Sequence, residues 1–174
     1  MAVRLKMMVL AVLGLAVLSV GIAGVVAAND KSRFKTALTG YEETPSVSSA
    51  GSGEFTATVD DENQTIHYTL MFANLNSTVL FAHVHFGQRG VAGGVAAFLC
   101  GGGSKPDPCV PGTTITGTIT PADVISPAGQ GIAAGEWNEL VAAIRSGVAY
   151  ANVHSTTQPA GEIRGQINDK DQRD

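Results

Sequence analysis

The chain has 174 residues, with 11 Lys plus Arg against 15 Asp plus Glu, so its formal net charge is -4. The length suits one domain. The weakly acidic charge excludes the basic surface that nucleic-acid binding requires, so we expect no nucleic-acid partner. An apolar content of 44% is too high for a disordered chain, and two cysteines exclude a disulfide-dense miniprotein and a four-cysteine zinc site.

Residues 1–28 have the features of an export signal. A short basic start precedes residues 7–28, which carry no charge. The ending Val26-Ala27-Ala28 offers short side chains to a signal peptidase, which favours cleavage before Asn29. The uncharged run also reaches the roughly 20 residues that span a bilayer, so an uncleaved membrane anchor is the alternative. Both interpretations place residues 29–174 outside the cytoplasmic membrane, and only the anchor gives a membrane contact.

The exported part is expected to contain one β-domain at 37–168, with a polar linker at 29–36 before it and a charged tail at 169–174 after it. Cys100 and Cys109 bracket a loop rich in Gly, Ser and Pro, so they can meet across a turn. An oxidising compartment favours a disulfide between them. The spacing is wider than that of a typical redox pair, so we expect a bond that clips the loop.

Most of this domain has the pattern of β-strands. Residues 54–59 and 65–72 each alternate apolar with more polar side chains, which predicts strands with one buried face. Asp60–Asn63 between them predicts a hairpin turn. Short strands joined by Gly- and Pro-rich turns are typical of a sandwich or barrel, so the predicted fold class is all-β. Further strands are predicted at 80–86, 94–99, 113–119, 148–154 and 162–167.

Residues 136–146 depart from the strand pattern. Their apolar side chains recur at helical spacing, and Gly147 follows as a natural stop, so we expect one short helix near 136–146. A single helical turn is predicted to begin at Thr120, because Pro121 follows it at the first helical position.

Three histidines form the candidate metal site. His83 and His85 are two residues apart on a predicted strand, so their rings project from one face and Val84 from the other. His154 lies on a second predicted strand with Asn152, facing away from the core. If these strands are neighbours, the three imidazoles converge on one outward surface and suit copper or zinc.

The same residue types also have plainer interpretations. Histidines on an exposed strand can be solvated, or each can fix a loop by bonding its backbone. His67 is expected to be an exposed strand residue outside the site. Glu42-Glu43 precedes a proline and is interpreted as a solvated turn. Glu162 and Arg164 share a predicted strand face, and we expect them to form structural ion pairs.

The chain resembles the CHRD domain, the module named after chordin, over about residues 34–168. The resemblance implies an extracellular protein with an immunoglobulin-like β-barrel. Four segments in the order and spacing of the family carry it, and they are Leu38–Pro45, Ala82–Gly87, Ile144–Ser155 and Pro159–Ile167.

CHRD domains are in turn distantly similar to copper–zinc superoxide dismutases, which have a Greek-key β-barrel. His83-Val84-His85 resembles their His-Val-His copper pair, His154 a later copper ligand, and Arg164 their anion-guiding arginine. The resemblance implies a copper site of three histidines, with Asn152 and Arg164 beside it. The chain departs from the dismutases because no bridging histidine follows His85 before His154, and it has no zinc loop.

Two functions from different classes follow. The first is an exported, non-enzymatic binding or structural module of the cell surface or extracellular space, with an extracellular protein or surface component as its partner. The alternative is a copper-binding or dismutase-like redox protein that uses His83, His85 and His154. In a third interpretation these histidines are purely structural, so their replacement lowers stability even without metal.

Overall fold

The computed structural model describes residues 32–127 and 129–169. The predicted signal or anchor segment lies outside the described residues, as does most of the predicted tail. Within the described ranges, no helix is both long and apolar enough to cross a membrane. In chain order the elements are β1 (Arg33–Thr39), η1 (Gly40–Glu42), β2 (Ser52–Asp60), β3 (Thr65–Ala73), β4 (Val79–Phe86), β5 (Gly94–Cys100), β6 (Ile115–Ile119), η2 (Pro121–Asp123), α1 (Trp137–Arg145), β7 (Ala149–Ser155), β8 (Ile163–Gln166) and β9 (Asn168–Asp169).

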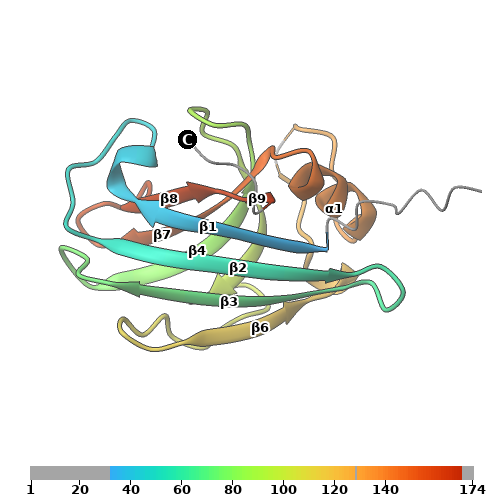
Figure 1. The fold of residues 1–174 in the computed structure, drawn as a ribbon, viewed down its shortest axis with the longest axis horizontal. Coiled ribbons are helices and arrows are strands. Elements are labelled where there is room, and N and C mark those ends of the chain that lie inside the picture. The colour runs from blue at the N-terminus through green and yellow to red at the C-terminus, as the bar shows by residue number, and fades with distance from the viewer. Residues whose placement is uncertain (1–31, 128, 170–174) are drawn as a thin grey trace, which may run out of the picture.

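The described strands belong to one antiparallel sheet that curls into a barrel (Figure 1). Their order is β5-β4-β7-β8-β1-β2-β3-β6, and β9 pairs with β1. The two ends of this order, β5 and β6, approach each other. The Tyr68 hydroxyl on β3 also donates to the carbonyl of Leu99 on β5 (2.7 Å). The prediction of an all-β barrel or sandwich is confirmed.

Side-chain alternation places the core where the sequence predicts it. On β3 the four apolar side chains between Ile66 and Phe72 that face inward are at most 4% exposed, whereas Met71 faces solvent. The turn between β2 and β3 is the predicted hairpin. There the Asp60 carboxylate accepts hydrogen bonds from the backbone N–H and the side-chain amide of Asn63 (3.0 and 2.8 Å).

The first strand begins earlier than predicted, so the expected linker at 29–36 is wrong for residues 33–36. β1 pairs with β2 along its whole length, from Arg33 opposite Thr58 onward. Phe34 and Leu38 are buried, with 3% and 0% exposure. The basic residues between the apolar ones hide the alternation. The short β9 also pairs with β1, although its last residue falls in the predicted tail.

The helix α1 lies at one end of the barrel (Figure 1) and confirms the helix predicted near 136–146. Its apolar face packs into the common core through Trp137, Leu140, Val141, Ala143 and Ile144. Gly147 follows with a φ of 69°, the left-handed conformation that commonly ends helices. The predicted turn after Thr120 is also present, because Thr120 and Asp123 form a capping box around η2.

The disulfide Cys100–Cys109 forms as predicted, with the two Cα atoms 5.3 Å apart. It closes the loop after β5, which stabilises the fold by about 2–3 kcal/mol in the chain-entropy model.

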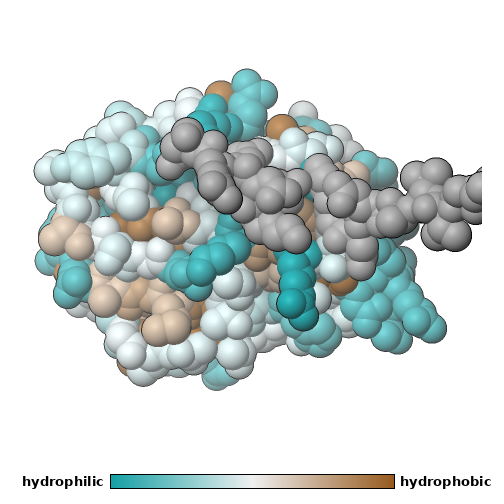
Figure 2. Space-filling view, viewed as in Figure 1, coloured by the Kyte–Doolittle hydropathy of each residue, from teal (hydrophilic) through white to brown (hydrophobic). Residues whose placement is uncertain are grey.

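The surface over β1, β2 and β3 is mixed in character (Figure 2). Hydrophilic side chains lie among smaller groups of apolar ones on this face. The large apolar side chains that are exposed by a third or more come from several different elements and loops. Among the described residues they are Tyr41, Met71, Leu80, Val91, Val110 and Ile125.

Replacing Leu70 by alanine should destabilise the protein by about 2–5 kcal/mol, because this β3 side chain is fully buried and its removal leaves a cavity. Met71→Ala is the matched control on the same strand. Its side chain is 47% exposed, and we expect a change within about 0.5 kcal/mol. Urea unfolding followed by circular dichroism measures both, and equal losses would contradict the assigned strand faces.

Candidate metal centre

β4 and β7 bring the three predicted ligands together. The strands are antiparallel neighbours, with His83 opposite Asn152 in the register. One ring nitrogen from each of His83, His85 and His154 lies within 4.8 Å of the others. The expectation that the two histidine strands lie side by side is confirmed. His67 stays exposed on β3, as predicted, and is not part of this group.

The three rings are buried, so the prediction that they lie on an outward surface is wrong. His83, His85 and His154 are 4%, 7% and 5% exposed. They project from the face of the sheet opposite Val84 and Val153, which belong to the barrel core. Loops cover this second face, and every residue of β7 is buried. The site is therefore an interior one.

Two loop carbonyls set the position of the protons on two of the rings. The Gly93 oxygen lies 2.9 Å from His85 Nδ1, and the Pro159 oxygen lies 3.0 Å from His154 Nδ1. A carbonyl only accepts, so each Nδ1 carries the proton and donates it. In the neutral rings the lone pair is therefore on Nε2. Metal-binding histidines are commonly held in this way, with the other ring nitrogen bonded to a carbonyl.

His83 adds a third nitrogen close to these lone pairs. Its Nδ1 lies 3.1 Å from His154 Nε2 and donates to it. The Nε2 atoms of His83 and His85 are buried without a hydrogen-bond partner. Phe81 and Phe98 pack against the His83 ring, with centroids 4.8 and 4.4 Å away. Buried polar atoms without partners cost free energy, and a cation bound at His85 Nε2 removes that cost for this atom.

The nitrogen positions fit a single metal ion. Imidazole binds zinc at about 2.0–2.1 Å, so two ligands at an angle of about 100° lie about 3.1 Å apart. That is the distance from His83 Nδ1 to His154 Nε2. Two ligands of one ion are at most about 4.1 Å apart, so a pair separated by up to 4.8 Å closes by at most about 0.7 Å. Coordination through His83 Nδ1 moves the proton of that ring to Nε2, with no net release.

The buried rings are neutral near pH 7. Burial lowers the pKa of His83 to about 3, and the charges of His154 and His85 act in the same direction. Burial also lowers the pKa of His85 to about 4, against the opposing bond to Gly93, and it lowers the pKa of His154. Since neutral imidazole is the form that binds a metal, protons do not compete for the site at this pH.

Arg164 on β8 holds a covering loop in place. Its guanidinium donates to the carbonyls of Gln88 and Val91 (3.1 and 3.0 Å). It also lies over the ring of Tyr150, 3.4 Å from the centroid, and that ring stacks on His85 with centroids 4.7 Å apart. Arg164 is only 2% exposed. These contacts favour a positioning role over the anion-guiding role that the resemblance implies.

The prediction of a solvated turn at Glu42-Glu43 is wrong for Glu43. Its side chain is 8% exposed, and burial raises the pKa of its carboxyl to about 7 against the opposing charge of Arg164. The signal that sequence reasoning missed is Gly161. This glycine has a φ of 134°, and a β-carbon there would overlap the Glu43 carboxyl. Only the folded chain brings these two distant positions together.

Asn152 lies between Glu43 and the histidines. Its Oδ1 is 3.0 Å from His154 Nε2, and because that nitrogen carries a lone pair, the two atoms are both acceptors and form no hydrogen bond. The same side chain interacts with the Glu43 carboxyl and favours its ionised form. Asn152 therefore lies beside His154 of the candidate metal centre.

Glu162 makes hydrogen bonds where we expected an ion pair with a neighbouring side chain. It is fully buried, and its carboxylate accepts hydrogen bonds from the Ser49 hydroxyl (2.6 Å) and the Asn76 N–H (2.7 Å). It also accepts one from the Ser155 hydroxyl. Glu162 therefore ties loops to the end of β7, and this is a structural role.

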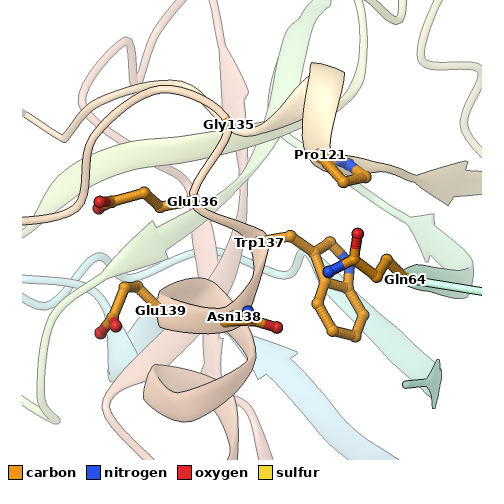
Figure 3. A pocket seen from close by; sticks show the side chains of 7 residues that line it. All are labelled: Gln64, Pro121, Gly135, Glu136, Trp137, Asn138 and Glu139. Atoms are coloured by element: carbon orange, nitrogen blue, oxygen red, sulfur yellow. The ribbon is translucent and has the colours of Figure 1, made fainter. Parts of the chain in front are cut away.

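A separate hollow of about 330 Å³ lies at the start of α1 (Figure 3). The side chains of Trp137 and Gln64 lie on one side of it, whereas Glu136 and Glu139 point the other way (Figure 3). The Trp137 Nε1 has no hydrogen-bond partner but is itself covered. The hollow thus offers a ligand no convergent set of side chains, and the histidine cluster is the stronger candidate.

A family model for the CHRD domain matches residues 34–167. The chain belongs to the CHRD family. No curated protein and no solved structure matches it. All three histidines and Glu43 fall within the matched range, so the candidate metal centre is part of the CHRD domain itself. The similarity to dismutases stays an expectation from the sequence.

In metal-free buffer the rings of His83 and His85 should stay neutral down to about pH 5. Their pKa values in the folded protein lie below the value of 6.5 for a free ring. The unfolded chain therefore binds more protons than the folded protein below pH 6.5. The free energy of unfolding that these neutral rings contribute is fully present above pH 6.5 and is lost as the pH falls toward 4. Nitrogen NMR of the imidazoles measures this directly. Midpoints near pH 6.5 for both rings would contradict the buried cluster.

Proposed function

We propose that this protein is an exported CHRD module that acts by binding, and that it holds a copper ion with His83, His85 and His154. Membership of the CHRD family supports a binding or structural module. The partner of such a module is an extracellular protein or surface component. Copper binding is the function that the geometry of the centre supports best.

One observation carries the metal proposal. One ring nitrogen from each of three histidines lies within 4.8 Å of the others in the interior. Loop carbonyls hold the protons of His85 and His154 on Nδ1, so the lone pairs of these rings are on Nε2. A merely structural histidine needs one such bond. It does not need a further lone pair, on His85 Nε2, left buried without a partner.

The donor set favours copper among the divalent metals. Neutral imidazole suits copper and zinc, and copper has the higher affinity for a given nitrogen site. Three protein ligands also leave a coordination position open, which favours a dismutase-like redox role as the second candidate. Because all three rings are buried, rapid access of a substrate is hindered, and we place binding before turnover.

Export is supported by three features of the chain. Residues 1–28 have the composition of a signal peptide, with the anchor as the alternative. The disulfide Cys100–Cys109 suits an oxidising compartment. The CHRD resemblance implies an extracellular location. A site with three imidazoles is also compatible with copper capture outside the cell, because no thiolate is required.

Copper titration followed by electron paramagnetic resonance tests the proposal. We expect one copper ion per chain with a nitrogen-rich signal in the unmodified protein, and a loss of at least about tenfold in affinity for His83→Ala and for His154→Ala. His67→Ala is the matched control, because that histidine is exposed on β3 and lies outside the cluster. Its copper affinity should equal that of the unmodified protein.

Unchanged copper binding in both cluster variants would show that this site does not exist. Thermal unfolding in the presence of a chelator separates the structural interpretation. If the histidines only fix loops, the cluster variants lose stability without metal, and added copper stabilises neither them nor the unmodified protein.

A further inference from the structure

A buried carboxyl, that of Glu43, is linked to the histidine cluster through Asn152, and the proposed ligands do not use it. Glu43 is 8% exposed, and its Oε1 has no hydrogen-bond partner. Gly161 leaves the space that this carboxyl fills, since a β-carbon at that position would overlap it. The fold therefore contains a fitted place for a carboxyl group beside the candidate metal centre.

Asn152 connects this carboxyl to the cluster. Its Oδ1 faces His154 Nε2 at 3.0 Å, whereas the side chain also interacts with Glu43 and favours the ionised carboxylate. An amide with its oxygen toward a cation and its NH2 toward an anion has its dipole aligned with both. A charge at one end is therefore felt at the other.

The cluster has no negative charge of its own to balance a metal ion. Three neutral imidazoles surround the position, and the charged side chain that acts on His85 is the cation Arg164, which lies over Tyr150 beside that ring. Bringing a second cation into a buried site costs much free energy unless an anion compensates it. Glu43 faces Arg164 and Tyr150, and Arg164 also faces Glu42 and Arg89. The carboxylate of Glu42 is already paired with Arg89 at 2.6 Å.

We propose that Glu43 is the counter-charge of the metal centre and that it gives up its proton when the metal binds. This inference rests on the proposed metal site. In the metal-free protein the carboxyl carries the proton at pH values below about 7. As the cation enters, the O–H bond of Glu43 breaks and the proton passes to solvent, so the bound site gains one negative charge. No oxidant or reductant is involved, and Glu43 acts as a positioning charge through Asn152.

The electrostatics of the metal-free protein agree with this assignment. Burial raises the pKa of Glu43 to about 7, although Arg164 and Asn152 both act to lower it. The carboxyl is therefore about half protonated at pH 7. A nearby metal ion favours the ionised form, so the proton leaves on binding.

Calorimetric titration with copper(II) in two buffers of different ionisation enthalpy measures the protons released. At pH 7 the unmodified protein should release about half a proton more per copper than Glu43→Gln. At pH 8 the copper affinity of Glu43→Gln should be about tenfold lower. Glu42→Gln is the matched control, because the adjacent carboxylate forms a surface ion pair with Arg89. Its proton release and affinity should equal those of the unmodified protein.

Infrared difference spectroscopy of the unmodified protein at pH 6 provides a second measurement that needs no variant to fold. Copper binding should remove the carbonyl band of one protonated carboxyl. If that band is unchanged, or if Glu43→Gln releases the same protons with the same affinity, Glu43 is not the counter-charge and the metal site itself stands. If the unmodified protein binds no copper, both the metal site and this role fail.

Discussion

Two hydrogen bonds from imidazole Nδ1 groups to loop carbonyls determine what the centre of this protein can do. Because the Gly93 and Pro159 carbonyls accept from His85 and His154, both rings present Nε2 lone pairs to the interior rather than N–H groups. The sheet supplies the positions through the pairing of β4 with β7. The loops supply the orientation, and without that orientation the histidines would be ordinary buried side chains.

The buried titratable side chains around the candidate metal centre carry little charge without a metal, apart from Arg164. Burial keeps His83 and His85 neutral by lowering their pKa values to about 3 and 4, and it favours the neutral Glu43 carboxyl by raising its pKa to about 7. The charged member is Arg164, which carbonyls and the Tyr150 ring stabilise. The two shifts have opposite effects on the stability of the fold. The neutral histidines increase the free energy of unfolding as the pH rises to 6.5, whereas the raised pKa of Glu43 decreases it between pH 4.5 and 7. In the proposed counter-charge role, a bound cation shifts Glu43 toward the carboxylate.

Much of the barrel could be predicted from local pattern. Apolar and polar side chains alternate clearly in residues 54–59 and 65–72. The helical spacing of apolar side chains and the following Gly147 predict α1. β1 was hidden because Arg33 and Lys35 flank Phe34, so the alternation resembled a polar linker. The common direction of the His83 and His85 side chains could be predicted, because residues two apart share a strand face. The pairing of β4 with β7 was not encoded in any local pattern, and it rested on the assumption that the two strands are neighbours.

Burial of the centre could not be predicted in the same way. The covering contacts join residues far apart in the chain, such as Arg164 with the carbonyls of Gln88 and Val91. The alternation of apolar and polar side chains distinguishes the two faces of a strand. It does not indicate whether loops cover the face that points away from the core. Glu43 was missed for the same reason, since its burial depends on Gly161, which lies more than a hundred residues along the chain.

Diffraction from crystals of the copper-loaded protein, collected on both sides of the copper absorption edge, tests the central claim most directly. The account predicts one anomalous peak in the interior, within bonding distance of a ring nitrogen of each of His83, His85 and His154. A copper-loaded crystal with no peak between β4 and β7, or with copper only at exposed positions such as His67, would contradict it.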